Sequence, residues 1–426
     1  MPTSPTTDFS QMSATQFYEQ MVAQNLLRGY IVHPKAAASR TLPESLLQVV
    51  DGVHANPGYA NHEAVFFQVD VPTKCLFFVF VHDTTRGMAQ GGTRMLAYPT
   101  IGDMLYDGLR LSRAMTEKNS VAGLWWGGGK AIICPIDGMD NINPARRKSI
   151  FERYGAFVAS LNGVFVAAED MNTTPEDMQV ILTQNRFVTC LPPAVGGSSN
   201  PSPWTAKGVF QAMRAAAKHY HQKDALTGMS VLIQGVGNVG KYIAQLLHED
   251  GAHLLIADTN PKALAAVQAF APDAEIVPLD AVYTTSCDIF APCARGGGVN
   301  KNTIPNLKCQ HIIGAANNQL EDDERDTELL KARNITYLPD FFINRMGIIN
   351  CANEQYGYLE EDLNKAVQKI FQDVLWLLKA SEDNSAAPYK LAIDQARVLT
   401  AIEHPIWGHR GIKIIGDLLG HWSYVL

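Results

Sequence analysis

Two lysines and two adjacent carboxylates lie near glycine-rich segments in the first half of the chain. Lys118 stands in MTEKN, Lys130 directly follows glycines 127–129, and Glu169 and Asp170 end VFVAAED. Glycines leave the backbone open to a ligand, and the apolar WW and KAIICPI segments around them predict a partly dry pocket at a strand mouth. Desolvation lowers the pKa of a lysine, which suits Lys130 to act as a general base. Alone, the triple glycine is more typical of a flexible turn followed by a solvated lysine.

A phosphate-binding P-loop also ends in Gly-Lys, but the spacing here excludes it. Leu124 stands where the first glycine of that motif is required, and Ala131 replaces the Ser or Thr that would hold magnesium. The sequence also contains neither HExxH nor GxSxG, the signatures of zinc proteases and serine hydrolases. We therefore expect no metal site.

The second half of the chain carries a dinucleotide-binding fingerprint. Gly235, Gly237 and Gly240 form GVGNVG between the apolar VLIQ and an amphipathic segment, and Asp258 follows the next apolar run about twenty residues later. The glycines permit a tight turn, approach of a pyrophosphate to a helix N-terminus, and close packing of helix on strand. A carboxylate at Asp258 would bind ribose hydroxyls and repel a 2'-phosphate, which favours NAD over NADP.

Hydrophobic periodicity predicts the elements that position the first cluster. The runs 64–71 and 75–81 predict a hairpin, and helical spacing predicts helices over 15–27, 103–118 and about 143–161. The helix over 103–118, with Thr100 or Asp103 as its cap, would bring Lys118 to its C-terminal end. The strand VFVAAED would present Asp170 at its C-terminal end, where open α/β sheets place reacting groups.

The segment GGSSNPSPWTAKGV predicts a crossing between two domains, followed by a helix over 205–219. After the fingerprint we expect strands in CDIFAPC, HIIGAANN and TYLPDFFIN, and then helices over 360–379 and 388–402. The fold class is thus α/β, with an α/β substrate domain and a Rossmann-type doubly wound dinucleotide-binding domain. The predicted limits are 1–203 for a substrate and oligomerisation domain with a mobile tail at 1–12, 204–380 for the NAD domain, and 381–426 for helices that return to the first domain.

Composition excludes several other classes of protein. With 426 residues, 18% charged and 46% hydrophobic, the chain is long enough for two domains with full cores. A net charge of -7 gives no electrostatic case for nucleic acid or an acidic membrane. The seven cysteines contain no CxxC pair, and the N-terminus lacks the basic and apolar regions of a signal peptide. We therefore expect a cytoplasmic protein. Because an exposed tryptophan is costly, Trp407 or Trp422 should pack on the first domain or a neighbouring subunit.

Ten motifs occur in a consistent order and spacing between His82 and Glu354: HDTTRG, GGTR, MTEKN, GGGK, AAEDMNTT, GGSSNPSPWTA, GVGNVG, CDIFAPCA, GAANNQL and LPDFFIN. Through them the chain resembles the superfamily of glutamate, leucine, phenylalanine and valine dehydrogenases, nearest to its leucine and phenylalanine branch. The resemblance implies a substrate domain and an NAD(P) domain with a cleft between them. It also implies reversible conversion of an L-amino acid to its 2-oxo acid and ammonia by a homo-oligomer.

The resemblance assigns roles to individual residues. Lys118 resembles the lysine that pairs with the substrate α-carboxylate, and Lys130 the catalytic lysine that activates water at the iminium carbon. Asp170 resembles the acid that exchanges a proton with the amino group. Its neighbour Glu169 is the rival, but successive strand residues point to opposite faces, so Asp170 receives the role.

Further roles follow from the same resemblance. Thr205 resembles the threonine at the nicotinamide amide, and Asn317 and Asn318 the polar pair that lines cofactor and substrate. The substrate-binding set comprises Lys118, Gln90, Gly91, Gly92 and Asn318, with the two glycines in a substrate loop. The cofactor-binding set comprises Gly235, Gly237, Asn238, Val239, Gly240, Asp258, Thr205 and Asn317.

The chain departs from the family pattern at several positions, namely Gln90, Trp125, Trp126, Arg345 and Met346. Leucine enzymes of the family carry an aliphatic residue at the position of Gln90, and glutamate enzymes carry a lysine. An amide does not neutralise a side-chain carboxylate, yet burying it beside an aliphatic side chain costs about 1 to 3 kcal/mol. The pocket is therefore expected to take a side chain with a polar or aromatic feature.

Three hypotheses for the function remain at this point. The first is an NAD-dependent dehydrogenase of apolar or aromatic amino acids, which we favour. The second is the same chemistry on a polar or acidic amino acid such as glutamate. The third is a catalytically weak NAD-binding regulatory protein, which the presence of Lys118, Lys130 and Asp170 disfavours.

Overall fold

The computed structural model describes residues 9–32 and 44–422. The chain divides into two compact units, Met1–Asn200 with Leu399–Leu426 and Pro201–Val398. The first crossing lies near the expected boundary at 203/204. The second lies later than the expected 380/381, because α12 (Glu360–Asp383) packs along α6 (Ser202–His221) within the second unit.

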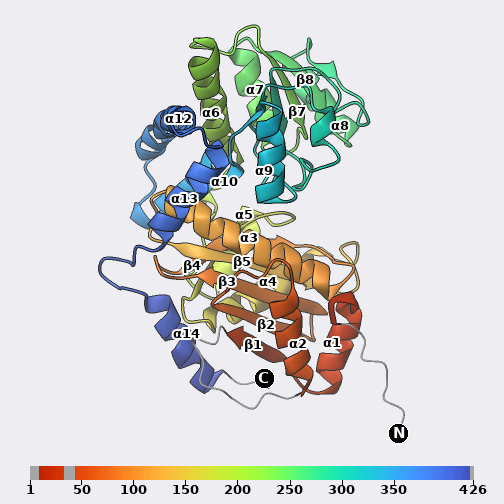
Figure 1. Cartoon of the computed structure of the whole chain (residues 1–426). Helices are drawn as coiled ribbons and strands as arrows, with labels where there is room; N and C mark the ends of the chain where they lie inside the picture. Colours follow the sequence, from red (N-terminus) through yellow and green to blue (C-terminus); the bar gives the residue numbers. More distant parts are fainter. Residues whose placement is uncertain (1–8, 33–43, 423–426) are drawn as a thin grey trace. The chain divides into compact units, whose positions relative to one another are not determined.

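Each unit contains its own six-stranded sheet with helices around it (Figure 1). The elements of unit 1 are η1 (Phe9–Gln11), α1 (Ala14–Ala23), β1 (Arg28–Val32), α2 (Glu44–Ala55), β2 (Ala64–Asp70), β3 (Cys75–Asp83), β4 (Ala89–Met95), α3 (Ile101–Val121), β5 (Gly127–Pro135), α4 (Pro144–Ala159), β6 (Phe165–Glu169), α5 (Pro175–Leu182), η2 (Pro193–Val195) and α14 (Arg410–His421).

The sheet of unit 1 has the strand order β1-β2-β3-β5-β4-β6. Strands β1, β2, β3 and β5 pair antiparallel, whereas β4 pairs parallel with β5 on one side and with β6 on the other. The predicted hairpin is confirmed as β2 and β3. The carboxyl ends of the three parallel strands therefore meet at one edge of the sheet, which is where Asp170 leaves β6.

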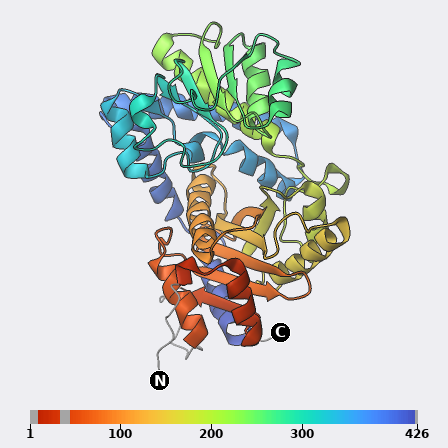
Figure 2. The ribbon, with the colours of Figure 1, turned by 90° about the vertical axis from the view of Figure 1, so that its right-hand side faces the viewer.

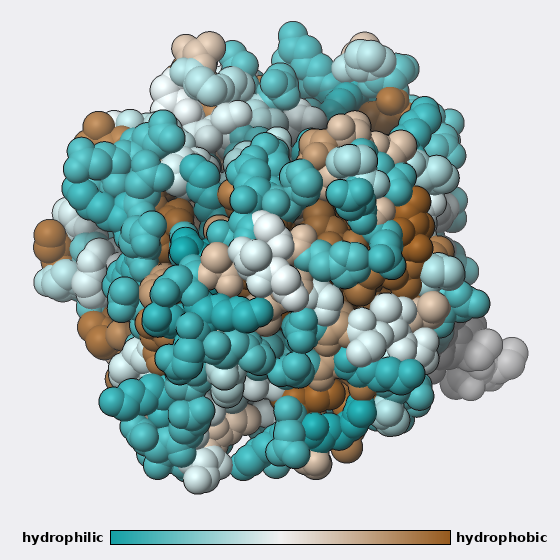
Figure 3. Space-filling model, turned by 90° about the horizontal axis from the view of Figure 1, so that it is seen from above, coloured by the Kyte–Doolittle hydropathy of each residue, from teal (hydrophilic) through white to brown (hydrophobic). Residues whose placement is uncertain are grey.

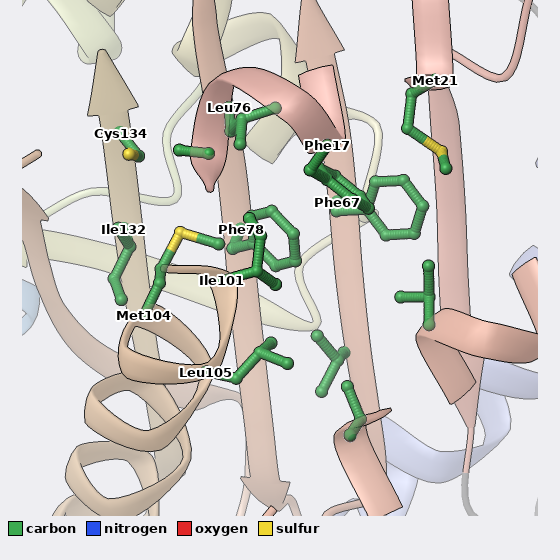
Figure 4. Packing of buried hydrophobic residues seen from close by; sticks show 14 of the residues in the cluster. Phe17, Met21, Phe67, Leu76, Phe78, Ile101, Met104, Leu105, Ile132 and Cys134 are labelled. Carbon is green, nitrogen blue, oxygen red and sulfur yellow. The ribbon is translucent and has the colours of Figure 1, made fainter. Parts of the chain in front are cut away.

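Helices α1 and α3 bury apolar side chains on one face of this sheet (Figure 4). Phe17 contributes from α1 and Met104 from α3, and both join Phe67, Phe78 and Ile132 in one core cluster. Every residue of β2 is buried, as is the first part of β3, which explains the nearly continuous apolar runs of these strands.

The opposite face of the sheet is covered by aromatic side chains from α4 and from the C-terminal segment. Phe157 of α4 lies 6.1 Å from Phe77 between ring centroids. Trp422 packs on Tyr30, Phe66 and Phe157 and is 8% exposed. Trp422 thus packs on the sheet of unit 1, whereas Trp407 is 56% exposed in the single chain.

Unit 2 has a wholly parallel sheet in the order β12-β11-β10-β7-β8-β9, as a Rossmann-type domain requires. Figure 2 shows the ribbon from a second side. The elements of unit 2 are α6, β7 (Ser230–Gln234), α7 (Gly240–Glu249), β8 (His253–Ala257), α8 (Pro261–Gln268), β9 (Glu275–Ile276), β10 (Ile289–Pro292), η3 (Ile304–Asn306), β11 (His311–Ile312), α9 (Asp323–Ala332), β12 (Thr336–Tyr337), α10 (Asp340–Ile343), α11 (Met346–Asn353), η4 (Glu354–Tyr356), α12 and α13 (Pro388–Thr400), which crosses the unit boundary.

Several expected elements are corrected by the structure. The strand expected in TYLPDFFIN ends at Tyr337, since Pro339 and Asp340 begin the short helix α10. The strand expected in HIIGAANN is likewise limited to β11. Of the tail expected to be mobile, residues 1–8 lie outside the described residues, but Phe9 and Met12 belong to the core cluster of unit 1.

Hydrophilic side chains cover most of the face shown in Figure 3, and apolar residues gather in patches between them. Among the residues that the structure describes, no helix is both long and apolar enough to span a bilayer.

Gly108 provides a test of how closely α3 approaches the sheet. A Cβ at this position would lie 2.2 Å from the ring of buried Phe80, whereas a Cβ at Gly416 in α14 would meet no atom within 4 Å. Alanine favours a helix over glycine by about 1 kcal/mol. We nevertheless expect Gly108→Ala to lower the free energy of unfolding by about 1 kcal/mol or more, since overpacking dominates. Gly416→Ala should leave it unchanged or raise it, as measured by urea denaturation. Stabilisation by Gly108→Ala would contradict this packing.

Candidate active site

The register of the parallel strands places Gln90 and Lys130, two of the predicted site residues of unit 1, on one face of the sheet. Gln90 pairs with Gly128 and Arg94 pairs with Ile132 across β4 and β5. Because side chains alternate along a strand and paired residues point the same way, Gln90, Arg94 and Lys130 share a face. Helix α3 packs over this face.

Lys130 and Asp170 form an ion pair between Nζ and Oδ2. Lys130 lies within β5, and its side chain is 6% exposed, while Asp170 immediately follows β6 and has a side chain 21% exposed. The structure therefore brings together the two residues predicted to be catalytic. An ammonium and a carboxylate in contact, in a mostly dehydrated setting, can exchange protons with a bound molecule.

Glycines at the crowded centre of the sheet make this pair possible. A Cβ at Gly92 would lie 2.7 Å from the Cβ of Asp170, and a Cβ at Gly91 would lie 1.7 Å from the carbonyl oxygen of Gly129. At Gly128 a Cβ would lie 1.9 Å from the Oγ1 of Thr116 on α3. Only glycine permits such approaches, because any side chain would push the neighbouring backbone away.

The local structure of two glycine segments differs from what the sequence predicts. Glycines 127–129 are the first residues of β5 and form no turn, so Lys130 lies inside the strand and not at its mouth. Gly91 and Gly92 likewise belong to β4 and not to a loop. The physical reason is the close approach of helix and strands, which requires glycines within the sheet itself.

A second cation reaches Asp170 from β4. The Nε of Arg94 lies 3.6 Å from Oδ2 of Asp170, and its Nη1 donates a hydrogen bond of 2.7 Å to Oδ2 of Asp107 on α3. The hydroxyl of Tyr98 donates to the same Asp107 oxygen at 2.5 Å. Sequence reasoning noticed GGTR only as a motif. The signal that could have found Arg94 is its spacing from Gln90 and Gly92, which puts all three on one face of a strand.

Burial and mutual attraction set the ionisation of the Lys130–Asp170 pair. Burial lowers the pKa of Lys130 below its ordinary value, although the charge of Asp170 opposes this. Burial tends to raise the pKa of Asp170, but the adjacent charges of Lys130 and Arg94 outweigh it and hold that pKa well below its usual range. Asp170 is therefore ionised, and Lys130 gives up its proton more readily than an exposed lysine.

Glu169 faces away from this pair. It pairs with Thr93 on β4, and the hydroxyl of Thr93 contacts Tyr154 of α4 on the opposite face of the sheet. Burial, and then the nearby charge of Asp170, raise the pKa of Glu169 to about 7. The register supports placing Asp170, and not Glu169, on the face of Lys130.

Lys118 occupies the last turn of α3, as expected, and is buried. The helix that carries it begins at the Thr100 cap, whose side chain accepts a hydrogen bond from the N–H of Asp103. The same helix supplies Asp107 to the charge network and Thr116 to the contact with Gly128. Lys118 and Lys130 thus lie on two elements that pack directly together.

Gln90 is fully buried on the same face of the sheet as Lys130. Neither its Oε1 nor its Nε2 makes a hydrogen bond to the described residues. An unpaired buried amide costs about 1 to 3 kcal/mol, so a polar group of a bound molecule is one way to relieve it.

In unit 2 the fingerprint glycines have the geometry that a dinucleotide requires. Gly235 has a φ of +94°, and a Cβ at Gly240 would lie 2.0 Å from the carbonyl oxygen of Gly235. A Cβ at Gly237 would meet no atom within 4 Å, so the loop is open at that point. The loop, with Asn238 and Val239, leads into α7, whose first N–H groups lack intrahelical partners and favour an anion. These residues fit the pyrophosphate of a nicotinamide dinucleotide.

Asp258 follows β8, as predicted, and is tied to the fingerprint loop. Its Oδ2 accepts a hydrogen bond from the N–H of Val236 at 2.8 Å, and its Oδ1 accepts one from the N–H of Asn260. These bonds hold the carboxylate next to the glycine turn, where an adenosine ribose would lie.

Thr205 and Asn317, the other predicted cofactor residues, both lie next to the segment 344–347 of unit 2. Asn344 donates a hydrogen bond of 3.1 Å to Oδ1 of Asn317, while a Cβ at Gly347 would lie 2.5 Å from Oγ1 of Thr205. Asn318 has a φ of +51°, and its N–H donates to Asp340. Asn317 and Asn318 follow β11, at the carboxyl end of the parallel sheet.

The side chains capable of binding a metal do not converge in the part of the chain that the structure describes. No group of three or more His, Cys, Asp or Glu residues is placed to hold an ion there.

Comparison with known proteins agrees with this arrangement. Residues 74–187 match the family domain described as Glu/Leu/Phe/Val dehydrogenase, dimerisation domain, and 196–261 with 255–375 match the domain described as Glutamate/Leucine/Phenylalanine/Valine dehydrogenase. The chain is 42% identical to leucine dehydrogenase of Geobacillus stearothermophilus over 315 residues, which cover 74% of this chain and 84% of that one. It is 39% identical to L-tryptophan dehydrogenase of Nostoc punctiforme over 325 residues, 76% of this chain and 89% of the relative.

Solved structures show the same relationship. The crystal structure of L-tryptophan dehydrogenase from Nostoc punctiforme matches with a TM-score of 0.64 at 36% identity and covers 80% of this chain and 96% of that one. A hetero-hexameric glutamate dehydrogenase from Thermus thermophilus shares the fold at 18% identity, also with a TM-score of 0.64. The chain belongs to the Glu/Leu/Phe/Val dehydrogenase family and is an amino acid dehydrogenase, an oxidoreductase of the NAD(P)-dependent kind.

Proposed function

We propose that this enzyme catalyses the reversible, NAD-dependent oxidative deamination of an L-amino acid with an apolar or aromatic side chain. The products are the 2-oxo acid, ammonia and NADH. The observation that carries the proposal is the buried Lys130–Asp170 ion pair on a glycine-lined sheet face, in a chain that also has a dinucleotide fingerprint. The relatives named leucine dehydrogenase and L-tryptophan dehydrogenase support this choice of substrate class.

The first step requires a neutral substrate amine. Lys118 pairs with the α-carboxylate and holds the amino acid against the sheet. Asp170, kept ionised by its cationic neighbours, accepts a proton from the substrate ammonium group. The lone pair of the neutral amine then forms the C=N bond as hydride leaves Cα, and bound NAD supplies the acceptor for that hydride.

The second step hydrolyses the resulting iminium. Lys130, with a pKa lowered by burial, takes a proton from water as the water oxygen attacks the iminium carbon. The carbinolamine formed then loses ammonia, with Asp170 returning a proton to the leaving nitrogen and the hydroxyl proton released as the carbonyl forms. Overall one water is consumed, and one proton is released for each amino acid oxidised when the ammonia is counted as ammonium ion.

The cofactor roles rest on unit 2. Gly235, Gly237 and Gly240 shape the pyrophosphate loop, and Asp258 binds the adenosine ribose hydroxyls. The family resemblance assigns Thr205 and Asn317 to the nicotinamide end of the cofactor and Asn318 to the substrate. A homo-oligomer assembled through unit 1 is supported by the family description of residues 74–187 as a dimerisation domain.

Loss of the Lys130 ammonium tests the mechanism. We expect Lys130→Ala and Asp170→Asn to lower kcat by about 100-fold or more, since each removes a proton-transfer group. NAD should still bind, because the fingerprint lies in unit 2, and binding is measured by calorimetry. Lys148→Ala serves as the control, because Lys148 is an exposed lysine of the same unit that pairs with nearby Glu152 on α4. Undiminished turnover by Lys130→Ala would remove Lys130 from the mechanism.

The assay for these variants also decides among substrate classes. NADH formation is followed at alkaline pH with a panel of L-amino acids. Turnover of leucine, valine, phenylalanine or tryptophan supports the proposed class, whereas turnover confined to glutamate or glutamine would indicate the polar alternative. If the protein binds NAD but forms no NADH with any amino acid of the panel, it is a regulatory protein and the proposal is overturned.

The unpaired amide of Gln90 predicts a change in substrate preference. Gln90→Leu places an aliphatic side chain on the substrate face and removes two unpaired buried polar atoms. We expect kcat/KM for leucine and valine to rise relative to tryptophan by about tenfold, the equivalent of 1.4 kcal/mol. The ratio is measured with both substrates on the same preparation. An unchanged ratio would show that Gln90 does not contact the substrate.

The charge of Asp258 predicts the choice of cofactor. Asp258→Asn keeps one of the two acceptors that the carboxylate offers to the loop and replaces the other by an NH2 group, and it removes the charge that repels a 2'-phosphate. The ratio of kcat/KM for NAD to that for NADP should fall by about tenfold or more, the equivalent of 1.4 kcal/mol or more. Asp273→Asn, at an exposed carboxylate of the same unit, should leave the ratio unchanged. If Asp258→Asn also leaves it unchanged, Asp258 does not select the cofactor.

A further inference from the structure

The proposed reaction makes a demand on Asp170 that Lys130 alone does not meet. Lys130 must lose its proton to act as a base, and at that moment Asp170 loses the cation with which it is paired. A carboxylate in a mostly buried site then tends to take up the proton itself, because burial disfavours its charged form. The site therefore needs a second positive charge that does not titrate.

Arg94 is placed to be that charge. Its side chain is 13% exposed, and its Nε lies 3.6 Å from Asp170 Oδ2, which is the oxygen that Lys130 also contacts. Arg94 Nε makes no hydrogen bond to the described residues. At this distance a small movement would convert the contact into a hydrogen bond. A guanidinium keeps its charge at every working pH, unlike an ammonium.

Arg94 is itself held from the other side. Its Nη1 donates to Asp107 at 2.7 Å, and Asp107 also accepts from Tyr98 at 2.5 Å. The guanidinium is thus fixed between a carboxylate on α3 and a carboxylate after β6. Because Tyr98 also donates to Asp107, the carboxylate that holds Arg94 is anchored independently of Lys130, and Arg94 can remain in place when the charge on Lys130 changes.

We propose that Arg94 is a positioning residue for this reaction, whose fixed charge keeps Asp170 ionised and oriented while Lys130 releases and regains a proton. This inference rests on the proposed function, since it gives Lys130 and Asp170 their roles. It adds a charge chain of Lys130, Asp170, Arg94, Asp107 and Tyr98 that joins three parallel strands to α3.

The charges around Lys130 act in opposite directions. Asp170 follows β6 and favours the ammonium, as does Asp107 from α3, whereas Arg94 on β4 disfavours it. Glu169 adds negative charge beside Asp170 from the opposite face, and Lys118 belongs to the same helix as Asp107. Removal of the Arg94 charge should therefore raise the pKa of Lys130, and removal of the Asp107 charge should lower it.

The test compares R94Q with D107N, two variants that break the same ion pair. The pH profile of kcat should have an ascending limb set by Lys130. We expect R94Q to move this limb to higher pH by about one unit or more, which is about a tenfold loss of rate on the limb. D107N should move it to lower pH. A merely structural role predicts similar, pH-independent losses in both variants, and that result would overturn the proposal.

Two further variants control the comparison. R94K keeps a cation at the site and should shift the limb less than R94Q does. R110Q removes a cation from α3 that lies beside Tyr106, and it should leave the limb in place. Equal shifts in R94K and R94Q would contradict a charge effect, as would a comparable shift in R110Q. Circular dichroism is used to confirm that each variant is folded.

A readout without turnover separates this proposal from the proposed function. Competitive labelling with acetic anhydride, followed by mass spectrometry of the peptide that contains Lys130, measures the apparent pKa of that amine. The labelling midpoint should rise in R94Q and fall in D107N even if no amino acid is oxidised. Unmoved midpoints would overturn the role of Arg94, whereas an inactive wild-type enzyme with moving midpoints would overturn only the proposed function.

Discussion

The structure of unit 1 depends on keeping an ammonium and a carboxylate in contact while both are largely removed from water. Separating such charges from solvent is costly, and breaking a buried pair by removing one partner is more costly still. Three features offset the cost: the contact of Lys130 with Asp170, the neighbouring Arg94, and the anchoring of Arg94 by Asp107. The network is therefore a condition for folding this part of the sheet, in addition to the roles that we propose for its members.

Close approach of backbone is the second constraint, and it follows from the first. Lys130 reaches Asp170 only because Gly92 leaves room beside the acid. In the same way Gly128 lets α3 lie against β5, so that this helix can supply both Lys118 and Asp107. The glycines are thus fixed by packing inside a sheet, and their apparent flexibility in the sequence is misleading. Unit 2 uses glycine for a different purpose, since Gly237 leaves space for a ligand.

Much of this arrangement could be predicted from the sequence. Order and spacing of motifs identified the family, and strand alternation was enough to prefer Asp170 over Glu169. Local sequence patterns predicted the wrong secondary structure at positions where tertiary packing determines it. Triple glycine reads as a turn, yet it forms the start of β5, and TYLPDFFIN reads as a strand, yet it turns helical at Asp340. The role of Arg94 was missed because its partners lie on α3 and after β6, and sequence spacing does not report such contacts.

Unit 1 is built from two stretches of the chain that are separated by unit 2, and this affects the order in which the units can fold. Unit 2 is formed by one continuous stretch, Pro201–Val398, whereas Trp422, which covers Phe66 and Phe157, is translated only after that stretch. Domains tend to fold as units while the chain emerges from the ribosome. Unit 2 can therefore reach its native state first, and the sheet of unit 1 keeps an uncovered aromatic surface until α14 and Trp422 have been synthesised. In that interval the exposed aromatic rings favour aggregation of the nascent chain.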